Sequence, residues 1–424
     1  MDKGLDAVNL NIGVSDGYAD RLLCTALDIG EGMLRSGGEI SRVENTIERI
    51  CFAYGAEHVE VFGITSVIIA AIRMKNGEYS SQVRRVKTSS NDLLRLELYN
   101  GISRRICAER PPFEDVSKML DEANKKSVYP KWLRLIIASL TAGIFAVFFG
   151  GNWVDGIVAS FIGAIIYLID KDLGLNFNKM AKTAINSFIG GFLACFSVFI
   201  GIGHSAAAVM IGTVMLLIPG LAFGTALRNL LCGDLLSGSL EIVRACLTAL
   251  MIALGYLTSM LIFSGVYSPI TNETLEIVRI ITVALGVIGF AVIFNIKPVR
   301  LFYVAVGGIG TYIIFTLLTS AEMPLFVCAL TASAFSALYS ETCARLLRAP
   351  SIVFLLPCAI PIVPGESLYN TMSNLLSGNN AISLEFLYKT ASIGVGIACG
   401  IVFVSILFSI AASVKATYFK HLKK

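Results

Sequence analysis

A short motif occurs twice in this sequence, and its two copies lie 145 positions apart. In each copy an apolar run ends at Pro-Gly, and the same Asn-Leu-Leu triplet and Gly follow at the same distances, the first copy from Pro219 and the second from Pro364. Proline removes a backbone N–H and blocks continuation of a helix, while glycine frees the backbone. Each copy is therefore predicted to be a membrane helix that breaks.

The same offset continues upstream of the motif. Phe145-Ala146-Val147 is matched by Phe290-Ala291-Val292. A constant offset maintained over about ninety residues is the signature of a repeated structural unit. We predict an internal repeat that covers roughly 133–265 and 278–412.

Composition divides the chain into two parts. The 424 residues are 55% hydrophobic, with a mean hydropathy of +0.74, and only 15% are charged, against about 25% in ordinary soluble domains. Charged residues are dense in 1–135 and sparse afterwards, which indicates a soluble domain followed by a membrane domain. The ten cysteines contain no C-x-x-C pair, and most lie in apolar runs, as expected of buried thiols in reducing surroundings.

The first 130 residues are predicted to form a small α+β cytoplasmic domain. Residues 1–16 read as a tail. Apolar residues at helical spacing and Val/Ile-rich segments then alternate. The predicted helices are Tyr18–Arg35, Ile40–Tyr54, Asp92–Glu109 and Phe113–Lys125, and the predicted strands are His58–Phe62, Ser66–Arg73 and Tyr79–Lys87.

After Pro130 the chain is predicted to be a polytopic α-helical membrane domain with about ten transmembrane helices. The apolar runs lie at about 133–150, 154–169, 183–201, 206–223, 243–263, 278–295, 299–319, 324–341, 351–363 and 387–411. They divide into two five-helix repeats, 131–268 and 269–424, the second ending in a basic tail. Because five is odd, the second repeat would start from the opposite side of the bilayer. The result is a 5+5 inverted repeat, an architecture of many secondary transporters.

Positive charge supports this orientation. With the N-terminal domain inside, Lys and Arg cluster in the predicted cytoplasmic segments, whereas the outer segments hold only Arg279 and Lys389. Both termini are therefore expected in the cytoplasm of a cell whose plasma membrane, the inner membrane in a bacterium, holds the spans. The net charge of +4 follows from the same bias, so no nucleic-acid partner is needed to explain it.

The Pro-Gly breaks are the first candidate site. A broken helix exposes N–H and C=O groups, which a membrane tolerates only where protein or a watery cavity satisfies them. Such helix ends hold carboxylates and ammonium groups in transporters. The alternative is that Pro-Gly merely ends a helix at the interface. The predicted substrate pathway comprises Pro219, Gly220, Arg228, Asn229, Pro364, Gly365, Glu366 and Asn374.

Ionisable residues near the spans are the second candidates, because buried charges are costly and often functional. Asp155, Glu241 and Glu341 lie near predicted span ends. We interpret them as interfacial residues rather than as a proton relay, and His204, in a short outer loop, as solvated. The chain shows no nucleophile elbow, P-loop, zinc spacing or dinucleotide fingerprint. An enzyme, a bound metal and a cofactor are therefore not expected.

Three segments carry a family resemblance: Leu27-Asp28-Ile29-Gly30, Leu34–Glu39 and Arg42-Val43-Glu44. They resemble the N-terminal signature of the threonine/serine exporter family, and the sequence from Pro364-Gly365 onward resembles its C-terminal five-span module. The resemblance covers about 18–412. It implies a cytoplasmic domain before ten spans and export of small hydrophilic metabolites, threonine and serine in the name-giving members. A two-protein version is associated with succinate export.

Within the signature, Gly37, Glu39 and Arg42 surround a predicted helix start. A structural cap with a salt bridge is favoured there over an anion-binding site. The domain that carries them is expected to regulate or gate transport by docking near Arg228 and Arg345, since the linker to the first span is short.

The favoured function is a secondary exporter of threonine, serine or similar small polar metabolites, driven by protons because no nucleotide site is present. A dicarboxylate exporter is the alternative. A membrane-anchored sensor or hydrolase is the rival from another class, and ten spans are more than an anchor needs. Arg228 would attract a carboxylate, Glu366 an ammonium group, and Asn229 and Asn374 would donate or accept hydrogen bonds. A homo-oligomer is compatible with all of these.

Overall fold

The computed structural model describes residues 17–86, 90–171, 178–217, 226, 229–230, 234–263, 275–376 and 378–422. The chain divides into two compact units, Met1–Lys126 and Ser127–Lys424. The expected tail, residues 1–16, lies outside the described residues.

The N-terminal unit contains a three-stranded antiparallel sheet in the order β1-β2-β3. Its strands are β1 (Ala56–Ile64), β2 (Val67–Met74) and β3 (Tyr79–Arg85). Gly77 has a φ of +86° in the turn between β2 and β3, a conformation that glycine adopts without strain. Along β2 the side chains of Ile68, Ala70 and Ile72 are buried while Ile69 is exposed, so one face of the sheet is covered.

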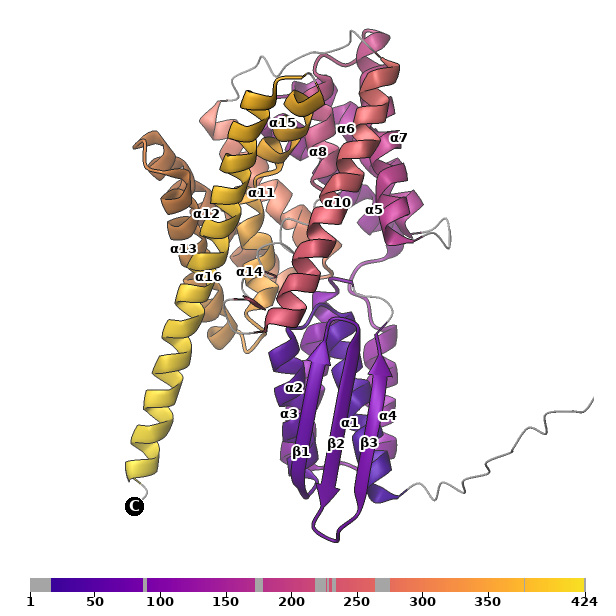
Figure 1. The fold of residues 1–424 in the computed structure, drawn as a ribbon, viewed down its shortest axis with the longest axis vertical. Coiled ribbons are helices and arrows are strands. Elements are labelled where there is room, and N and C mark those ends of the chain that lie inside the picture. The colour runs from indigo at the N-terminus through magenta and orange to yellow at the C-terminus, as the bar shows by residue number, and fades with distance from the viewer. Residues whose placement is uncertain are drawn as a thin grey trace, which may run out of the picture. The chain divides into compact units, whose positions relative to one another are not determined.

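Helices α1 (Tyr18–Arg35) and α2 (Ile40–Ala53) cover that face (Figure 1). Helices α3 (Leu93–Glu109) and α4 (Phe113–Lys125) pack against α1. The predicted α+β class is confirmed, and the helix bounds agree with the apolar periodicity to within one residue at each end. The sequence placed the strands correctly but underestimated the length of β1, because Ala56, Gly63 and Ile64 still pair with β2 in the backbone ladder.

The second unit is helical throughout the part that the structure describes (Figure 1). Its elements are α5 (Lys131–Phe148), α6 (Trp153–Lys171), α7 (Lys179–Phe199), α8 (Ala206–Val214), α10 (Leu235–Ile262), α11 (Glu276–Ile293), η1 (Pro298–Arg300), α12 (Leu301–Ser320), α13 (Leu325–Leu346), α14 (Ile352–Ala359), η2 (Ile360–Ile362), α15 (Gly365–Leu376) and α16 (Asn380–Leu422). Among the described residues, eight helices are long and apolar enough to cross a membrane, or nine if one bent pair counts as a span. This confirms a polytopic helical membrane protein. The predicted span 206–223 is described only as far as residue 217, and α8 accounts for its first nine residues.

The helix bounds repeat at the sequence offset. Both ends of α5 and α11 lie 145 positions apart, as do the first residues of α10 and α16. The two first helices also end in the same way, with Gly150 and Asn295 at positive φ. Past each of them, an N–H donates over 2.9 Å to the carbonyl five residues earlier, from Gly151 to Ala146 and from Ile296 to Ala291. Matched sequence positions thus adopt matched backbone geometry.

The two repeats meet where α5 crosses α11. The rings of Phe145 and Phe290, which are matched positions, lie 5.6 Å apart in an edge-to-face arrangement. Gly286 and Gly289 permit the close approach, since a Cβ at Gly286 would lie 2.7 Å from the Phe145 ring and one at Gly289 would overlap Thr141. Phe145 and Phe290 occupy matched positions of the 145-residue offset, so this contact joins two matched segments of the sequence.

The segment before α5 is also fastened to the second repeat. The Tyr129 hydroxyl donates to the carbonyl of Ile296 over 2.8 Å. The N–H of Val128 donates to Asn295 Oδ1 over 3.1 Å. The start of the first repeat is therefore held at the loop that follows the first helix of the second repeat.

Candidate functional site

The second Pro-Gly segment forms a broken helix. Helix α14 gives way to the 3₁₀ turn η2, and α15 begins at Gly365, with a bend of 48° between the two parts. Pro357, Pro361 and Pro364 punctuate this stretch, and each removes a backbone donor from the helical ladder. The geometry agrees with the break that the sequence predicts.

Polar side chains of α15 follow the break in the chain. Glu366 lies in the first turn of α15 and is exposed in the isolated chain, where a carboxylate complements the positive end of the helix dipole. Asn374 Nδ2 donates to the carbonyl of Asn370 over 2.8 Å, and the Ser383 hydroxyl of α16 donates to the carbonyl of Thr371 over 2.7 Å. The polar face of α15 is thus partly satisfied by its own helix and by α16.

Both copies of the motif end in the same way. The N–H of Asn379 donates to the carbonyl of Asn374, and that of Asp234 to the carbonyl of Asn229, each over 2.9 Å. In the second copy Gly378 has a φ of +77°, the conformation that closes a Schellman-type helix end. The repeated Asn thus accepts the same backbone hydrogen bond in both copies, and Gly378 closes the helix in the second.

The first copy is described only in part. Pro219, Gly220 and Arg228 lie outside the described residues. Asn229 Nδ2 donates to Glu241 Oε2 of α10 over 3.3 Å. The structure therefore joins a predicted pathway residue to a carboxylate that the sequence suggested was interfacial. No local pattern signalled this pair, because the two residues lie on separate segments.

Helix α15 packs into the first repeat, against α8 and α10. Tyr369 of α15 is 6% exposed and belongs to the hydrophobic cluster that Met210 of α8 and Ile252 and Tyr256 of α10 help to build. Sequence reasoning missed Tyr369, although its position three residues after Glu366 places it on a helical face. The segment after the second break is therefore part of the interface between the repeats.

The carboxylate of Asp155 is held by backbone hydrogen bonds. Its carboxylate is fully buried and accepts three backbone N–H bonds, from His204 (2.7 Å), Ser205 (3.2 Å) and Asn152 (3.1 Å). These bonds tie the start of α6 to the segment before α8. Glu341 lies 3.9 Å from Arg345, one turn away on α13.

The N-terminal signature residues occupy the turn between α1 and α2. Gly37 has a φ of +91°, and Glu39 is the residue that precedes α2. The backbone carbonyl of Arg42 accepts a bond from the Thr46 hydroxyl over 2.8 Å. Glu44 accepts the N–H of Gly63 over 2.7 Å and so links α2 to β1. The positive φ that this turn requires accounts for the glycine at position 37.

No metal centre is found in the part of the chain that the structure describes: no three His, Cys, Asp or Glu residues are grouped to hold an ion.

Comparison with known proteins gives two family matches and several distant relatives. A family model described as "Putative threonine/serine exporter" matches residues 25–263, and one described as "Threonine/Serine exporter, ThrE" matches residues 279–407. A "Probable threonine/serine exporter" of Mycobacterium tuberculosis is 22% identical over 58% of this chain and 47% of its own length. A "Probable succinate transporter subunit YjjP" of Klebsiella aerogenes is 24% identical over 54% of this chain and 88% of its own length.

A fungal protein, "Pheromone-regulated membrane protein 10" of Zygosaccharomyces rouxii, is 22% identical over 46% of this chain and 20% of its own length. The chain thus matches about half the length of the mycobacterial relative and a fifth of the fungal one. No solved structure matches the chain.

Proposed function

Because this chain belongs to the threonine/serine exporter family, we propose that it is a secondary transporter that exports threonine, serine or similar small polar metabolites. Two features support the proposal: the membrane unit is built from matched helices at a constant offset, and one of them is broken at Pro-Gly. Repeats with discontinuous helices are the recurring design of secondary transporters. With no P-loop in the sequence, the proton gradient is the proposed driving force.

The observation that carries the proposal is the position of α15. This helix follows the break in the second repeat, yet its Tyr369 lies in the core of the first repeat. Rocking of one repeat against the other would move the break relative to α8 and α10. We therefore place the substrate site between the repeats, at the start of α15.

Within that site, Glu366 would bind a substrate ammonium group, and Arg228 would attract a carboxylate. Asn229 and Asn374 would form hydrogen bonds with a hydroxyl or carboxylate. Opposite charges favour a zwitterionic amino acid over a dicarboxylate.

The transport test uses the purified full chain in lipid vesicles. Vesicles are loaded with labelled threonine, serine or succinate, and efflux is followed with and without a proton gradient. Threonine or serine efflux that accelerates with the gradient is the expected result. If none of the three compounds moves under either condition, the proposed substrates are wrong.

The site test uses Glu366→Gln and Asn374→Ala. Loss of one charged contact in a partly buried site typically costs a few kcal/mol, or on the order of a hundredfold in affinity. Both variants should therefore impair efflux while inserting normally into the membrane. Glu385→Gln is the matched control, because Glu385 lies on α16 in an exposed ion pair with Lys389. Normal kinetics in both site variants would place the site elsewhere.

A dicarboxylate exporter is the second candidate, which the similarity to the Klebsiella protein favours. It predicts that labelled succinate leaves the vesicles and that threonine and serine do not. Such a result would also remove the proposed role of Glu366, since a carboxylate repels a dianion.

We further propose that the protein lies in the plasma membrane with both termini in the cytoplasm, and that the N-terminal unit regulates transport. Reporter fusions in the loop 201–205 should report the outer side. A cytoplasmic signal there would contradict the orientation. Deletion of residues 1–125 should alter transport or its regulation in a protein that still inserts stably.

A further inference from the structure

Two hydrogen bonds join the segment before α5 to the loop between α11 and η1, and both partners belong to the second unit. The Tyr129 hydroxyl donates to the carbonyl of Ile296 over 2.8 Å, and the N–H of Val128 donates to Asn295 Oδ1 over 3.1 Å. Tyr129, Asn295 and Ile296 are 8%, 1% and 1% exposed, so water competes little for these bonds. We call this pair of bonds the linker joint.

Asn295 stands where the first repeat has a glycine. Asn295 and Gly150 are matched positions, and both have a positive φ, +60° and +94°. Glycine adopts this conformation without strain, and asparagine is among the few other residues that tolerate it. The second repeat thus keeps the turn and gains a side-chain acceptor, which binds the linker.

The loop side of the joint leads to the broken helix. The guanidinium of Arg300, at the end of η1, lies 5.9 Å from the ring centre of Phe354 in α14. Cys358 Sγ of α14 donates to the carbonyl of Val304 in α12 over 3.5 Å, and a Cβ at Gly307 would lie 2.5 Å from that sulfur. Because closely packed interiors transmit displacements, a shift of this loop reaches α14, the first part of the broken helix.

The linker side of the joint leads to α4. The last backbone bond of that helix runs from the N–H of Lys126 to the carbonyl of Glu122 over 3.2 Å. The Ser127 hydroxyl donates to the carbonyl of Tyr129 over 3.1 Å, and Pro130 follows, whose ring restricts φ. Only Ser127 therefore separates the end of α4 from the first residue of the joint.

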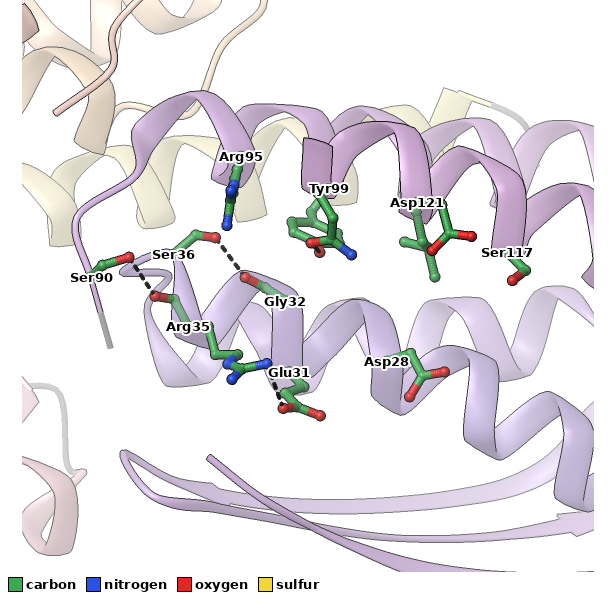
Figure 2. A pocket seen from close by; sticks show the side chains of 12 residues that line it. Asp28, Glu31, Gly32, Arg35, Ser36, Ser90, Arg95, Tyr99, Ser117 and Asp121 are labelled. Carbon is green, nitrogen blue, oxygen red and sulfur yellow. Dashed lines mark hydrogen bonds and ion pairs between the residues drawn. The ribbon is translucent and has the colours of Figure 1, made fainter. Parts of the chain in front are cut away.

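The same helix forms one wall of a polar cavity in the N-terminal unit. The cavity lies between α1, α3 and α4 and has a volume of about 470 Å³ (Figure 2). The Tyr99 hydroxyl of α3 donates to Asn124 Oδ1 of α4 over 2.6 Å, and the Tyr99 ring lies directly against Gly32 of α1, where any Cβ would overlap it. A change in this packing therefore reaches α4 close to its end.

We propose that Tyr129 and Asn295 are positioning residues, and that the linker joint passes changes in the N-terminal unit to the broken helix α14–α15. The inference rests on the proposed regulation of transport by the N-terminal unit, for which it supplies the route. Coupling between distant parts of a protein is carried by packed side chains and hydrogen bonds. Each step from α4 to α14 is such a contact or a short stretch of chain.

The experiment measures hydrogen–deuterium exchange by mass spectrometry on the purified full chain and perturbs the N-terminal unit at two places. Gly32→Ala places a methyl group against the Tyr99 ring, and Asn124→Ala removes the acceptor of the Tyr99 hydroxyl. Each should change exchange in α14 and α15 by about two- to tenfold, within the range of coupling between connected residues.

Breaking the joint should abolish this response. Tyr129→Phe removes the hydroxyl and keeps the ring, while Asn295→Gly removes the acceptor and keeps the positive φ. Combined with either variant, Gly32→Ala should no longer change exchange in α14 and α15, because effects along one route are not additive. The matched control is Tyr339→Phe. Its hydroxyl donates to the carbonyl of Tyr303 over the same 2.8 Å but takes no part in the joint, so the response should persist.

Two results would overturn the inference: unchanged exchange in α14 and α15 with both perturbations of the N-terminal unit, or a response that persists in full in both Tyr129→Phe and Asn295→Gly. Exchange requires no substrate, so the transport proposals fail separately. Vesicles that export neither threonine nor serine, with the response of α14 intact, would refute export. Efflux that Gly32→Ala leaves unchanged, with the same response intact, would refute regulation and leave the joint assigned.

Discussion

Replacing Asp155 tests whether its carboxylate is a structural tie. In the wild type it accepts three backbone N–H bonds from a fully buried position. In Asp155→Asn one oxygen becomes an NH₂ group, which cannot accept, so at least one N–H loses its partner. In Asp155→Ala all three lose theirs.

Each buried donor left unsatisfied costs roughly 1–3 kcal/mol. Asp155→Asn should therefore destabilise the membrane unit by about 1–3 kcal/mol and Asp155→Ala by about 3–9 kcal/mol, the upper end being reduced where the segment relaxes. For a unit of this size, about 2 °C of melting temperature corresponds to 1 kcal/mol. The asparagine variant should then melt about 2–6 °C lower, and the alanine variant lower still.

The assay is thermal unfolding of the purified protein in detergent with a thiol-reactive fluorophore. Cys195 and Cys358 are buried in the folded unit and become labelled when it opens. Glu385→Gln is again the control, since an exposed pair on one helix is worth only about 0.3–0.5 kcal/mol. If the asparagine and alanine variants melt like this control, the three bonds do not stabilise the fold and the reasoning is wrong.

Two further predictions concern the N-terminal unit. Gly32→Ala should force Tyr99 out of place and destabilise the unit by about 1–3 kcal/mol, measured as faster hydrogen exchange in α1 and α3; unchanged exchange would contradict the close contact. Burial, and to a lesser extent the charge of Cys107, raises the pKa of Cys51 from 9.0 to about 12, so Cys51 should resist alkylation at pH 9 while the half-buried Cys24 reacts, as mass spectrometry would show. Because the folded pKa of Cys51 lies above the unfolded value, this thiol's contribution to stability is complete below pH 9 and is lost as the pH rises toward 12. Rapid labelling of Cys51 in the folded protein at pH 9 would refute the shift.

Much of the architecture could be predicted because the decisive signals are local. The apolar periodicity of Tyr18–Arg35 and Phe113–Lys125 gave helix bounds that the structure reproduces. The constant offset between Phe145 and Phe290 anticipated matched helices, and Pro364 anticipated the bend. Each of these depends on chain neighbours or on comparison of the chain with itself.

What escaped prediction depends on packing between distant segments. Asn229 meets Glu241 only because the chain turns back at the end of the motif. Nothing in the sequence distinguishes Tyr369 from other aromatic residues, and its role in packing appears only from the contact of α15 with the first repeat. Arg95 carries no motif, and the polar cavity that it lines becomes visible only when α1, α3 and α4 are assembled.

The contact between the matched residues Phe145 of α5 and Phe290 of α11 also bears on the energetics of the fold. If both halves had the same sequence, exchanging their conformations would produce a second state of equal free energy, and the protein would visit both equally. Any resting preference must come from positions where the halves differ. Pro357 and Pro361 stand where the first half has Gly212 and Leu216, so the second half has fewer backbone conformations available there. Making these positions alike would bring the two states closer in free energy, and the proportion of molecules in each would shift accordingly.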